Sequence, residues 1–427
     1  MNRSTRKSIF PLLLCAALLG CGGVSLSIFE WKVSYKNPEW QTFVSGDEIY
    51  LITSTTEDVD GDTRWIATLD QYNGKEKLWS SSILPDELTS IADVQLIETS
   101  PTDRLIHVFG NSTTGLESVS FDATGSQIYR APMAGTFVAA GINEQTLGAI
   151  TNRDGAYFLS TWSNNGWVDI TTLTIGSTEP KLESLNAHWI VTDTDNRQIL
   201  SIDQQGAARW EFTWDEGQYL TSIMVGTNSI VAVKRIDGSS ENELLYIEGE
   251  TGDHRSMVYY NADKILTLDA TDQAYLSTGT ANTRHITHVD HLGNTLWQSN
   301  QTYDRSNLGA AQLSPNGELA VTHYTEQFIG TDSHGSITEY TSLIDIVGQQ
   351  GLLERQYAAL PYQFSRFENC VEYCTVWSVK DGYHISKLFI DEDEEFYVRG
   401  VMPRITLGYF ANPTYFFAKI DAKDTVN

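Results

Sequence analysis

A recurring turn pattern constrains the fold of this chain more than any other feature of its sequence. In each copy a strand-like segment ends near an aspartate, a glycine follows three or four residues later, and an aromatic residue follows the glycine. The clear copies are Ile66–Gly74 with Trp79, Leu200–Gly206 with Trp210, and Thr287–Gly293 with Trp297, and Val119–Gly125 with Tyr129 is a weaker copy. Degenerate copies lie near Gly166, Gly252, Gly348 and Gly382. Successive glycines of this series are 34 to 55 residues apart, with a mean of 44, which is typical of a repeated small sheet.

The segments between these turns read as β-strands. After Glu30 they are short and rich in Val, Ile, Thr, Tyr, Phe and Trp, with Gly, Asn, Asp and Ser clusters between them. No long stretch keeps an apolar face at helical spacing. The chain is therefore predicted to be all-β, with Asp and Gly forming tight turns and the aromatic residue packing between neighbouring repeats.

This frame resembles the quinoprotein-type, or PQQ-like, repeat of β-propellers over most of residues 40–390. The resemblance implies a single β-propeller over residues 29–427, with seven or eight four-stranded blades and eight favoured. Propellers often close their ring by pairing an N-terminal strand with the last blade. Phe29–Tyr35 and Tyr415–Ile420 are the expected closing strands.

The N-terminus carries a targeting pattern. Basic residues at positions 3, 6 and 7 precede an apolar run from Ile9 to Leu19, which is too short for a permanent transmembrane helix. The segment Leu18–Cys21 resembles the end of a bacterial lipoprotein signal peptide. The resemblance implies removal of residues 1–20, lipid on Cys21 as the membrane anchor, and a short tether over residues 21–28. A plain secretory signal is the alternative.

Residue 22 indicates the membrane in which the protein is located, and the net charge indicates which classes of partner it can bind. Gly22 follows the cysteine, where an aspartate would favour the inner membrane of enterobacteria, so the outer membrane is expected, with the periplasmic side favoured over the cell surface. The formal net charge of -27 becomes -30 without the signal segment, because that segment holds three basic residues and no acidic ones. Such a charge disfavours nucleic acids and anionic lipid surfaces, and is expected to serve solubility or salt adaptation.

The other two cysteines of the mature chain, Cys370 and Cys374, are expected to form a disulfide outside the cytoplasm. In a continuous strand, residues four apart would be separated by about 13 Å, whereas a disulfide needs Cα atoms within about 7 Å. A bridge therefore requires a turn within Glu368–Thr375. A redox role is the alternative, although the spacing is not Cys-x-x-Cys.

The triplet Asp58, Asp60 and Asp62 resembles a calcium loop at first sight. An EF-hand loop needs glycine at its sixth position and glutamate at its twelfth, and these positions hold Thr63 and Leu69. We expect a solvated hairpin turn here, and no metal.

Two further charged or titratable groups are expected to be structural. In one extended strand His285 and His291 would share a face about 20 Å apart, with His288 on the other face, so we expect packing and no shared ion. The five consecutive carboxylates of residues 391–395 are expected to form an exposed loop between Leu388–Ile390 and Phe396–Val398.

No catalytic residue, cofactor or ligand site is identified from the sequence. Quinoprotein dehydrogenases use this kind of repeat around pyrroloquinoline quinone and Ca²⁺, but their adjacent cysteine pair has no counterpart here. We expect a non-catalytic, lipid-anchored scaffold that binds envelope proteins as a monomer within a complex. The chain is distantly similar to the propeller lipoproteins of the outer-membrane β-barrel assembly machinery, which implies a role in outer-membrane assembly. A surface binder of glycan or host ligand and a PQQ-type oxidoreductase are the alternatives.

Overall fold

The computed structural model consists of β-strands and their connections. It describes residues 29–421 apart from short segments, which are 36–38, 46–47, 60–61, 84–87, 101–102, 145, 164–165, 178, 240–241, 259–260, 281–282, 304–307, 333–334, 367–375, 381, 392, 404, 407–408 and 411–413. Among the residues described, no helix has the length and apolar character needed to span a membrane. Cys21, Cys370 and Cys374 lie outside the described residues.

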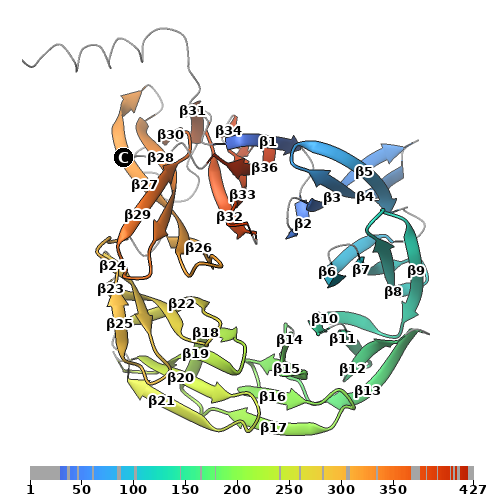
Figure 1. Cartoon of the computed structure of the whole chain (residues 1–427). Helices are drawn as coiled ribbons and strands as arrows, with labels where there is room; N and C mark the ends of the chain where they lie inside the picture. Colours follow the sequence, from blue (N-terminus) through green and yellow to red (C-terminus); the bar gives the residue numbers. More distant parts are fainter. Residues whose placement is uncertain are drawn as a thin grey trace, which may run out of the picture.

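Eight antiparallel sheets stand around a central axis as the blades of a propeller (Figure 1). In each blade the first strand lies nearest the axis and the fourth lies outermost. Blades 1 to 3 are β2 (Glu39–Ser45), β3 (Glu48–Val59), β4 (Asp62–Asn73), β5 (Glu76–Ile83); β6 (Ser90–Ser100), β7 (Asp103–Ser112), β8 (Gly115–Asp122), β9 (Gln127–Met133); and β10 (Thr136–Asn143), β11 (Thr146–Arg153), β12 (Ala156–Ser163), β13 (Gly166–Leu173).

Blades 4 to 6 repeat the same four-stranded order in consecutive strands. They are β14 (Lys181–Leu185), β15 (His188–Asp193), β16 (Gln198–Ile202), β17 (Ala208–Thr213); β18 (Gln218–Val225), β19 (Ser229–Ile236), β20 (Asn242–Glu248), β21 (His254–Val258); and β22 (Ala262–Leu268), β23 (Ala274–Thr280), β24 (Thr283–Val289), β25 (Thr295–Gln298).

Blade 7 is enlarged. Its strands are β26 (Leu308–Leu313), β27 (Leu319–Asp332), β28 (Gly335–Val347) and β29 (Leu353–Ala358), and β30 (Tyr362–Arg366) and β31 (Val376–Lys380) extend the sheet beyond β28. β28 is long enough to pair with β29 along its second half and with β30 along its first half.

Blade 8 closes the ring with both ends of the chain. It consists of β32 (His384–Ile390), β33 (Phe396–Met402), β36 (Thr414–Ile420) and, outermost, β1 (Phe29–Tyr35). β1 is antiparallel to β36, with Val33 opposite Phe417. A small hairpin of β34 (Ile405–Thr406) and β35 (Tyr409–Phe410) interrupts the connection from β33 to β36. The predicted eight blades and the predicted closing strands are thus confirmed.

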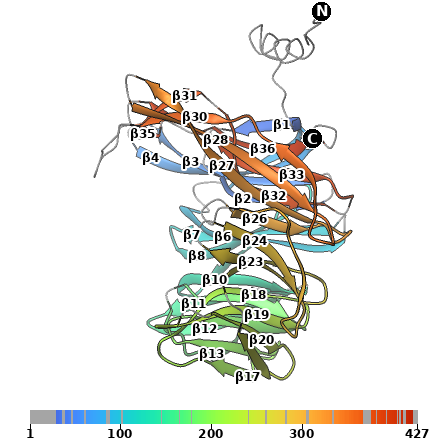
Figure 2. The same cartoon turned by 90° about the vertical axis from the view of Figure 1, so that its left-hand side faces the viewer.

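The ring has two distinct faces. Turns from the first to the second strand and from the third to the fourth strand of a blade lie on one face, which we call the turn face. Turns from the second to the third strand, and the connections between blades, lie on the other, which we call the crossover face. The long hairpins β3–β4 and β27–β28 extend beyond the ring on the crossover face (Figure 2).

The recurrent turn has one geometry in three of its copies. At Asp122, Asp203 and Asp290 the backbone carbonyl accepts the N–H of the glycine three residues later, at 2.9–3.0 Å. The aspartate Oδ1 also accepts two backbone N–H groups of the turn, as from residues 124 and 126 to Asp122 at 2.9 and 3.0 Å. Aspartate therefore fixes the turn, and glycine takes its left-handed residue, with φ of 77° at Gly125.

Two weaker copies and one clear copy, that of Asp70, depart from the predicted register. In blade 7 the left-handed turn residue is Gly351, whose N–H bonds the carbonyl of Gly348, so Gly348 stands where other copies have aspartate. Gly382 precedes β32 and forms no outer turn, because the outer strand of blade 8 comes from the N-terminus. Asp70 lies within β4 and pairs with Lys77, with Oδ2 and Nζ 2.7 Å apart.

The aromatic residue of the repeat connects neighbouring blades, as predicted. The indole Nε1 of Trp79 in blade 1 donates to the carbonyl of Ala123 in the outer turn of blade 2, at 3.1 Å. Trp210 in blade 4 donates in the same way to Gly249 of blade 5, at 2.7 Å. The hydrophobic core is divided accordingly into clusters of side chains, most of which lie between adjacent blades.

Gly125 has a left-handed φ and also lies against the Trp79 ring. Comparing its replacement with that of a glycine that has only the left-handed φ measures the two effects separately. A Cβ there would overlap the Trp79 ring, whereas Gly238 has nearly the same φ, 76°, with no atom near a Cβ. We expect Gly238→Ala to lower the free energy of unfolding by about 1 kcal/mol through φ alone. Gly125→Ala should lower it by about 1–3 kcal/mol more. Urea denaturation measures both, and equal losses would contradict the contact with Trp79.

His107 of β7 is a fully buried titratable group. Its ring has no exposed surface, and its Nδ1 lies 2.6 Å from the Ser120 hydroxyl oxygen. The Trp162 ring of blade 3 packs against it. Burial lowers the pKa of His107 from 6.5 to about 4, because the charged ring would lose its hydration.

The protein is therefore expected to lose stability in mild acid. The unfolded chain binds a proton at His107 below pH 6.5 and the folded chain does so only near pH 4. This difference should remove about 3 kcal/mol of the free energy of unfolding as the pH falls through that window. Urea denaturation from pH 7.5 to 4 should show a shallower decline for His107→Gln than for the natural chain. Parallel curves would contradict this role of His107.

Candidate functional site

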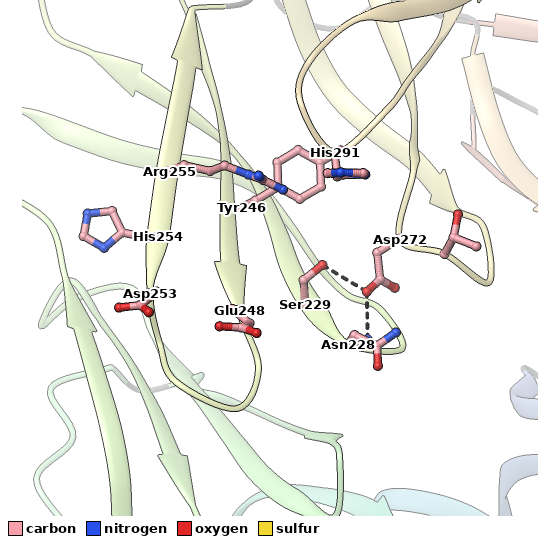
Figure 3. Close-up of a pocket in the computed structure, with 10 residues that line it drawn as sticks. Asn228, Ser229, Tyr246, Glu248, Asp253, His254, Arg255, Asp272 and His291 are labelled. Atoms are coloured by element: carbon pink, nitrogen blue, oxygen red, sulfur yellow. Dashed lines mark hydrogen bonds between the residues drawn. The ribbon is translucent and has the colours of Figure 1, made fainter.

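An open groove on the turn face joins blades 5 and 6 (Figure 3). It has a volume of about 410 Å³. Its walls come from four short stretches that are far apart in sequence, namely Asn228 and Ser229, residues 246–255, Thr271 with Asp272, and His291. Each stretch belongs to a turn or a strand end of one blade, so the groove exists only where the two blades meet.

Asp272 is the best-fixed side chain in the groove. It is 4% exposed and belongs to the first turn of blade 6, at φ 63°. Its carboxylate accepts the backbone N–H groups of Thr227 at 2.5 Å and Asn228 at 2.7 Å, and the hydroxyl of Ser229 at 3.0 Å. All three donors belong to blade 5. Asp272 is thus engaged in holding blade 6 to blade 5, as the dashed lines in Figure 3 show in part.

The remaining charged groups of the groove are exposed and of both signs. Glu248 and Asp253 are acidic, and Glu248 accepts the hydroxyl of Thr251 at 2.6 Å. The Arg255 guanidinium lies over the buried Tyr246 ring, 5.6 Å from its centroid. Burial raises the pKa of Tyr246, so its hydroxyl stays protonated as a hydrogen-bond donor. The groove therefore offers hydrogen-bonding groups and charges of both signs to a polar ligand.

A second buried polar cluster joins blades 6 and 7. Asp345 of β28 is fully buried and accepts hydrogen bonds from the Tyr303 hydroxyl at 3.0 Å and the Gln356 amide at 2.7 Å. His323 Nε2 lies 3.2 Å from the same carboxylate. His323 also lines a cavity of about 210 Å³ near the axis, together with Tyr324 and His384. Burial beside Asp345 raises the pKa of Tyr303.

The three histidines singled out from the sequence lie in three different surroundings. His285 Nδ1 is 3.2 Å from the carbonyl of Ser299. His288 stacks on Tyr275, with ring centroids 4.1 Å apart. His291 follows the end of β24 and lines the groove of Figure 3. In the part of the chain that the structure describes, no three His, Cys, Asp or Glu side chains are grouped to hold a metal ion.

The described residues of the two acidic segments lie at or next to the ends of paired strands. Asp58 and Asp62 lie at the ends of β3 and β4, which pair up to Val59 and Asp62, and Asp60 lies outside the described residues. Residues 391–395 form the turn from β32 to β33. The expectation of full exposure is wrong for Asp391, which is 7% exposed. Its carboxylate accepts two backbone N–H groups of its own turn and the Tyr397 hydroxyl, so these bonds compensate its burial.

Asp272 and Asp345 were not identified from the sequence. Asp272 ends the segment Asp269–Asp272, which forms the same turn as the Asp-to-Gly copies, with the Asp272 N–H bonded to the carbonyl of Asp269. The sequence signal that could have identified this turn is Asp272 itself, which stands three residues after Asp269, where the other turns have glycine. Asp tolerates a left-handed φ better than most residues. Asp345 carries no comparable signal, since its partners come from distant parts of the chain.

Comparisons with known proteins show similarity in fold only. No family model matches the chain, and no curated protein matches it. Among solved structures the chain is similar to BamB from Moraxella catarrhalis, with 13% identity and a TM-score of 0.49 over 91% of this chain and 98% of that one. It is similar to Kluyveromyces lactis Hsv2, with 10% identity and a TM-score of 0.44 over 75% and 99%. It is also similar to the dihydro-heme d1 dehydrogenase NirN, with 8% identity and a TM-score of 0.47 over 91% and 78%.

Replacing Asp272 should loosen the junction of blades 5 and 6. Asp272→Ala leaves two backbone N–H groups without their acceptor, which should lower the free energy of unfolding by about 1–3 kcal/mol. Asp253→Asn, in the exposed wall of the same groove, should change it by less than about 0.5 kcal/mol. Urea denaturation of both variants measures the difference. A loss for Asp272→Ala no larger than that for Asp253→Asn would contradict the structural role of Asp272.

Proposed function

We propose that this protein is a non-catalytic, protein-binding scaffold of the bacterial cell envelope. It is held by lipid on Cys21 at the periplasmic side of the outer membrane and serves in outer-membrane assembly. Its propeller offers two broad faces and long hairpins to partner proteins, and the ring keeps these surfaces at fixed positions relative to one another.

The position of β1 is the observation that carries the proposal. Phe29, the first residue of β1, lies opposite Ile420 at the end of β36, and the third strand of a blade ends at the turn face. Residues 21–28 lie between the proposed lipid site and β1, and eight extended residues span at most about 28 Å. Lipid on Cys21 would thus keep the start of β1, at the turn face, within about 28 Å of the membrane, which supports the proposed position of the scaffold.

The buried carboxylates also support a scaffold. Asp272 and Asp345 are the kind of buried acid that an enzyme could use, but each accepts hydrogen bonds that join two blades. A scaffold depends on such joints, because partners bound to different blades must keep their relative positions. The strong negative charge of the chain favours protein partners over nucleic acids.

The test is chemical crosslinking in intact cells, followed by purification of the protein from the membrane fraction. We expect envelope proteins among the adducts, and expect Cys21→Ser to lose its lipid, leave the membrane fraction and lose most adducts. Mass spectrometry of the N-terminal peptide checks the lipid. Recovery of no protein partner would contradict the scaffold, and full membrane retention of Cys21→Ser would contradict the anchor.

A further inference from the structure

Strand β27 of blade 7 extends beyond its inner neighbour. β26 pairs with β27 only as far as Leu308 opposite His323, whereas β28 pairs with β27 up to Gly335 opposite Asp332. Among the residues that the structure describes, the stretch 325–331 therefore has a paired strand on one side only. An edge of this kind presents backbone N–H and C=O groups to any strand that approaches it.

The opposite edge of the same hairpin is already occupied. β30 pairs with β28 from Ser336 opposite Arg366 to Tyr340 opposite Tyr362, and β31 continues the sheet. On that side the sheet ends at β31, and among the described residues the overhanging part of β27 is a further open edge of the same sheet. This edge lies on the crossover face, where the hairpin projects beyond the ring (Figure 2).

The side chains along this edge are unusually exposed for a strand. Residues 325–329 are all exposed in succession, on both faces of the hairpin. Phe328 is 63% exposed and Ile329 is 44% exposed. The pairing shifts register between Phe328 and Gly330, so Ile329 is the extra residue of a bulge. Adjacent exposed apolar side chains on an open edge mark a site of association.

The charge of the hairpin decides the kind of partner. Residues 319–347 contain Glu326, Asp332, Glu339 and Asp345 but no Lys or Arg. Natural open edges are usually protected by Lys or Pro, and β27 has neither. A second copy of this chain would set the same acidic residues against each other. A strand that carries basic residues would instead be attracted.

We propose that the β27 edge binds an extended segment of a partner protein, in which apolar residues alternate with Lys or Arg, as an added β-strand. Backbone hydrogen bonds along residues 325–331 supply affinity, Phe328 and Ile329 contact the apolar side chains, and Glu326 pairs with a basic one. The inference rests on the proposed scaffold function and names its docking surface.

The test uses fluorescein-labelled decapeptides and the full-length protein in fluorescence anisotropy. An alternating Lys–Val peptide should bind at least about tenfold more tightly than an alternating Lys–Pro peptide, which has the same charge but half the backbone donors, and than a Glu–Val peptide. Equal binding of the Lys–Val and Lys–Pro peptides would show non-specific attraction to an acidic protein and overturn the proposal.

Matched variants locate the site. Phe328→Lys/Ile329→Lys should weaken Lys–Val binding at least about tenfold, whereas Leu292→Lys should leave it unchanged, because Leu292 is equally apolar and 56% exposed on the turn face. Circular dichroism should show all variants folded, since each replaced side chain is exposed. Equal weakening by Leu292→Lys would overturn the proposed location.

Two further measurements test whether the β27 edge is occupied by another segment of this chain or by a second copy of it. Those backbone amides of residues 325–331 that point away from β28 should exchange rapidly with deuterium in the free protein and slowly with the Lys–Val peptide bound, whereas the amides bonded to β28 serve as the protected reference. If these outward-pointing amides are protected in the free protein, another segment of this chain covers the edge and the proposal is overturned. A dimer in sedimentation that the double variant abolishes would show that a second copy of the chain occupies the edge, and would also overturn the proposal. If the double variant keeps its crosslinked partners in cells while no peptide binds, the edge is rejected and the scaffold function stands.

Discussion

Packing between neighbouring blades is the interaction on which this propeller depends, and at three junctions an outer-strand tryptophan lies against the glycine turn of the next blade. A single blade cannot bury both faces of its sheet, so each blade is stable only against its neighbours. The Trp79 indole lies against Gly125 and donates to Ala123, and Trp210 lies against Gly252 and donates to Gly249. At other junctions the glycine of the outer turn meets Ile170 or Met257 instead, so the packing of each blade against the next is kept although the residues differ.

The sequence predicted this architecture well where the information is local. An aspartate, a left-handed glycine and an aromatic residue at fixed spacing form a turn and its contact, and the copies at Asp122, Asp203 and Asp290 have the same hydrogen bonds. The prediction was less accurate where another residue replaces one of the three. Gly348 occupies the aspartate position, and Gly382 has no outer turn because that strand is supplied by residues 29–35.

The groove and the buried clusters could not be predicted in the same way. Asp272 binds backbone groups about 45 residues earlier in the chain, and Asp345 binds Tyr303 from the preceding blade. These contacts depend on the angle between two sheets, which no short segment encodes. The same holds for the open edge of β27, because the edge follows from the lengths of β26, β27 and β30 taken together. Alternating strand patterns reveal a strand but not which of its sides stays unpaired.

The pairing of β1 with β36 has a consequence for the order of folding. Val33 and Phe417 are more than 380 residues apart, so the first of the described strands has no partner until nearly the last one is available. Non-local pairings of this kind are slow to form. The interior blades can associate beforehand through contacts between neighbours, as in other repeat proteins. Blade 8 is therefore the last to be completed, and β1 must stay unpaired without aggregating until the C-terminal strand β36 is available.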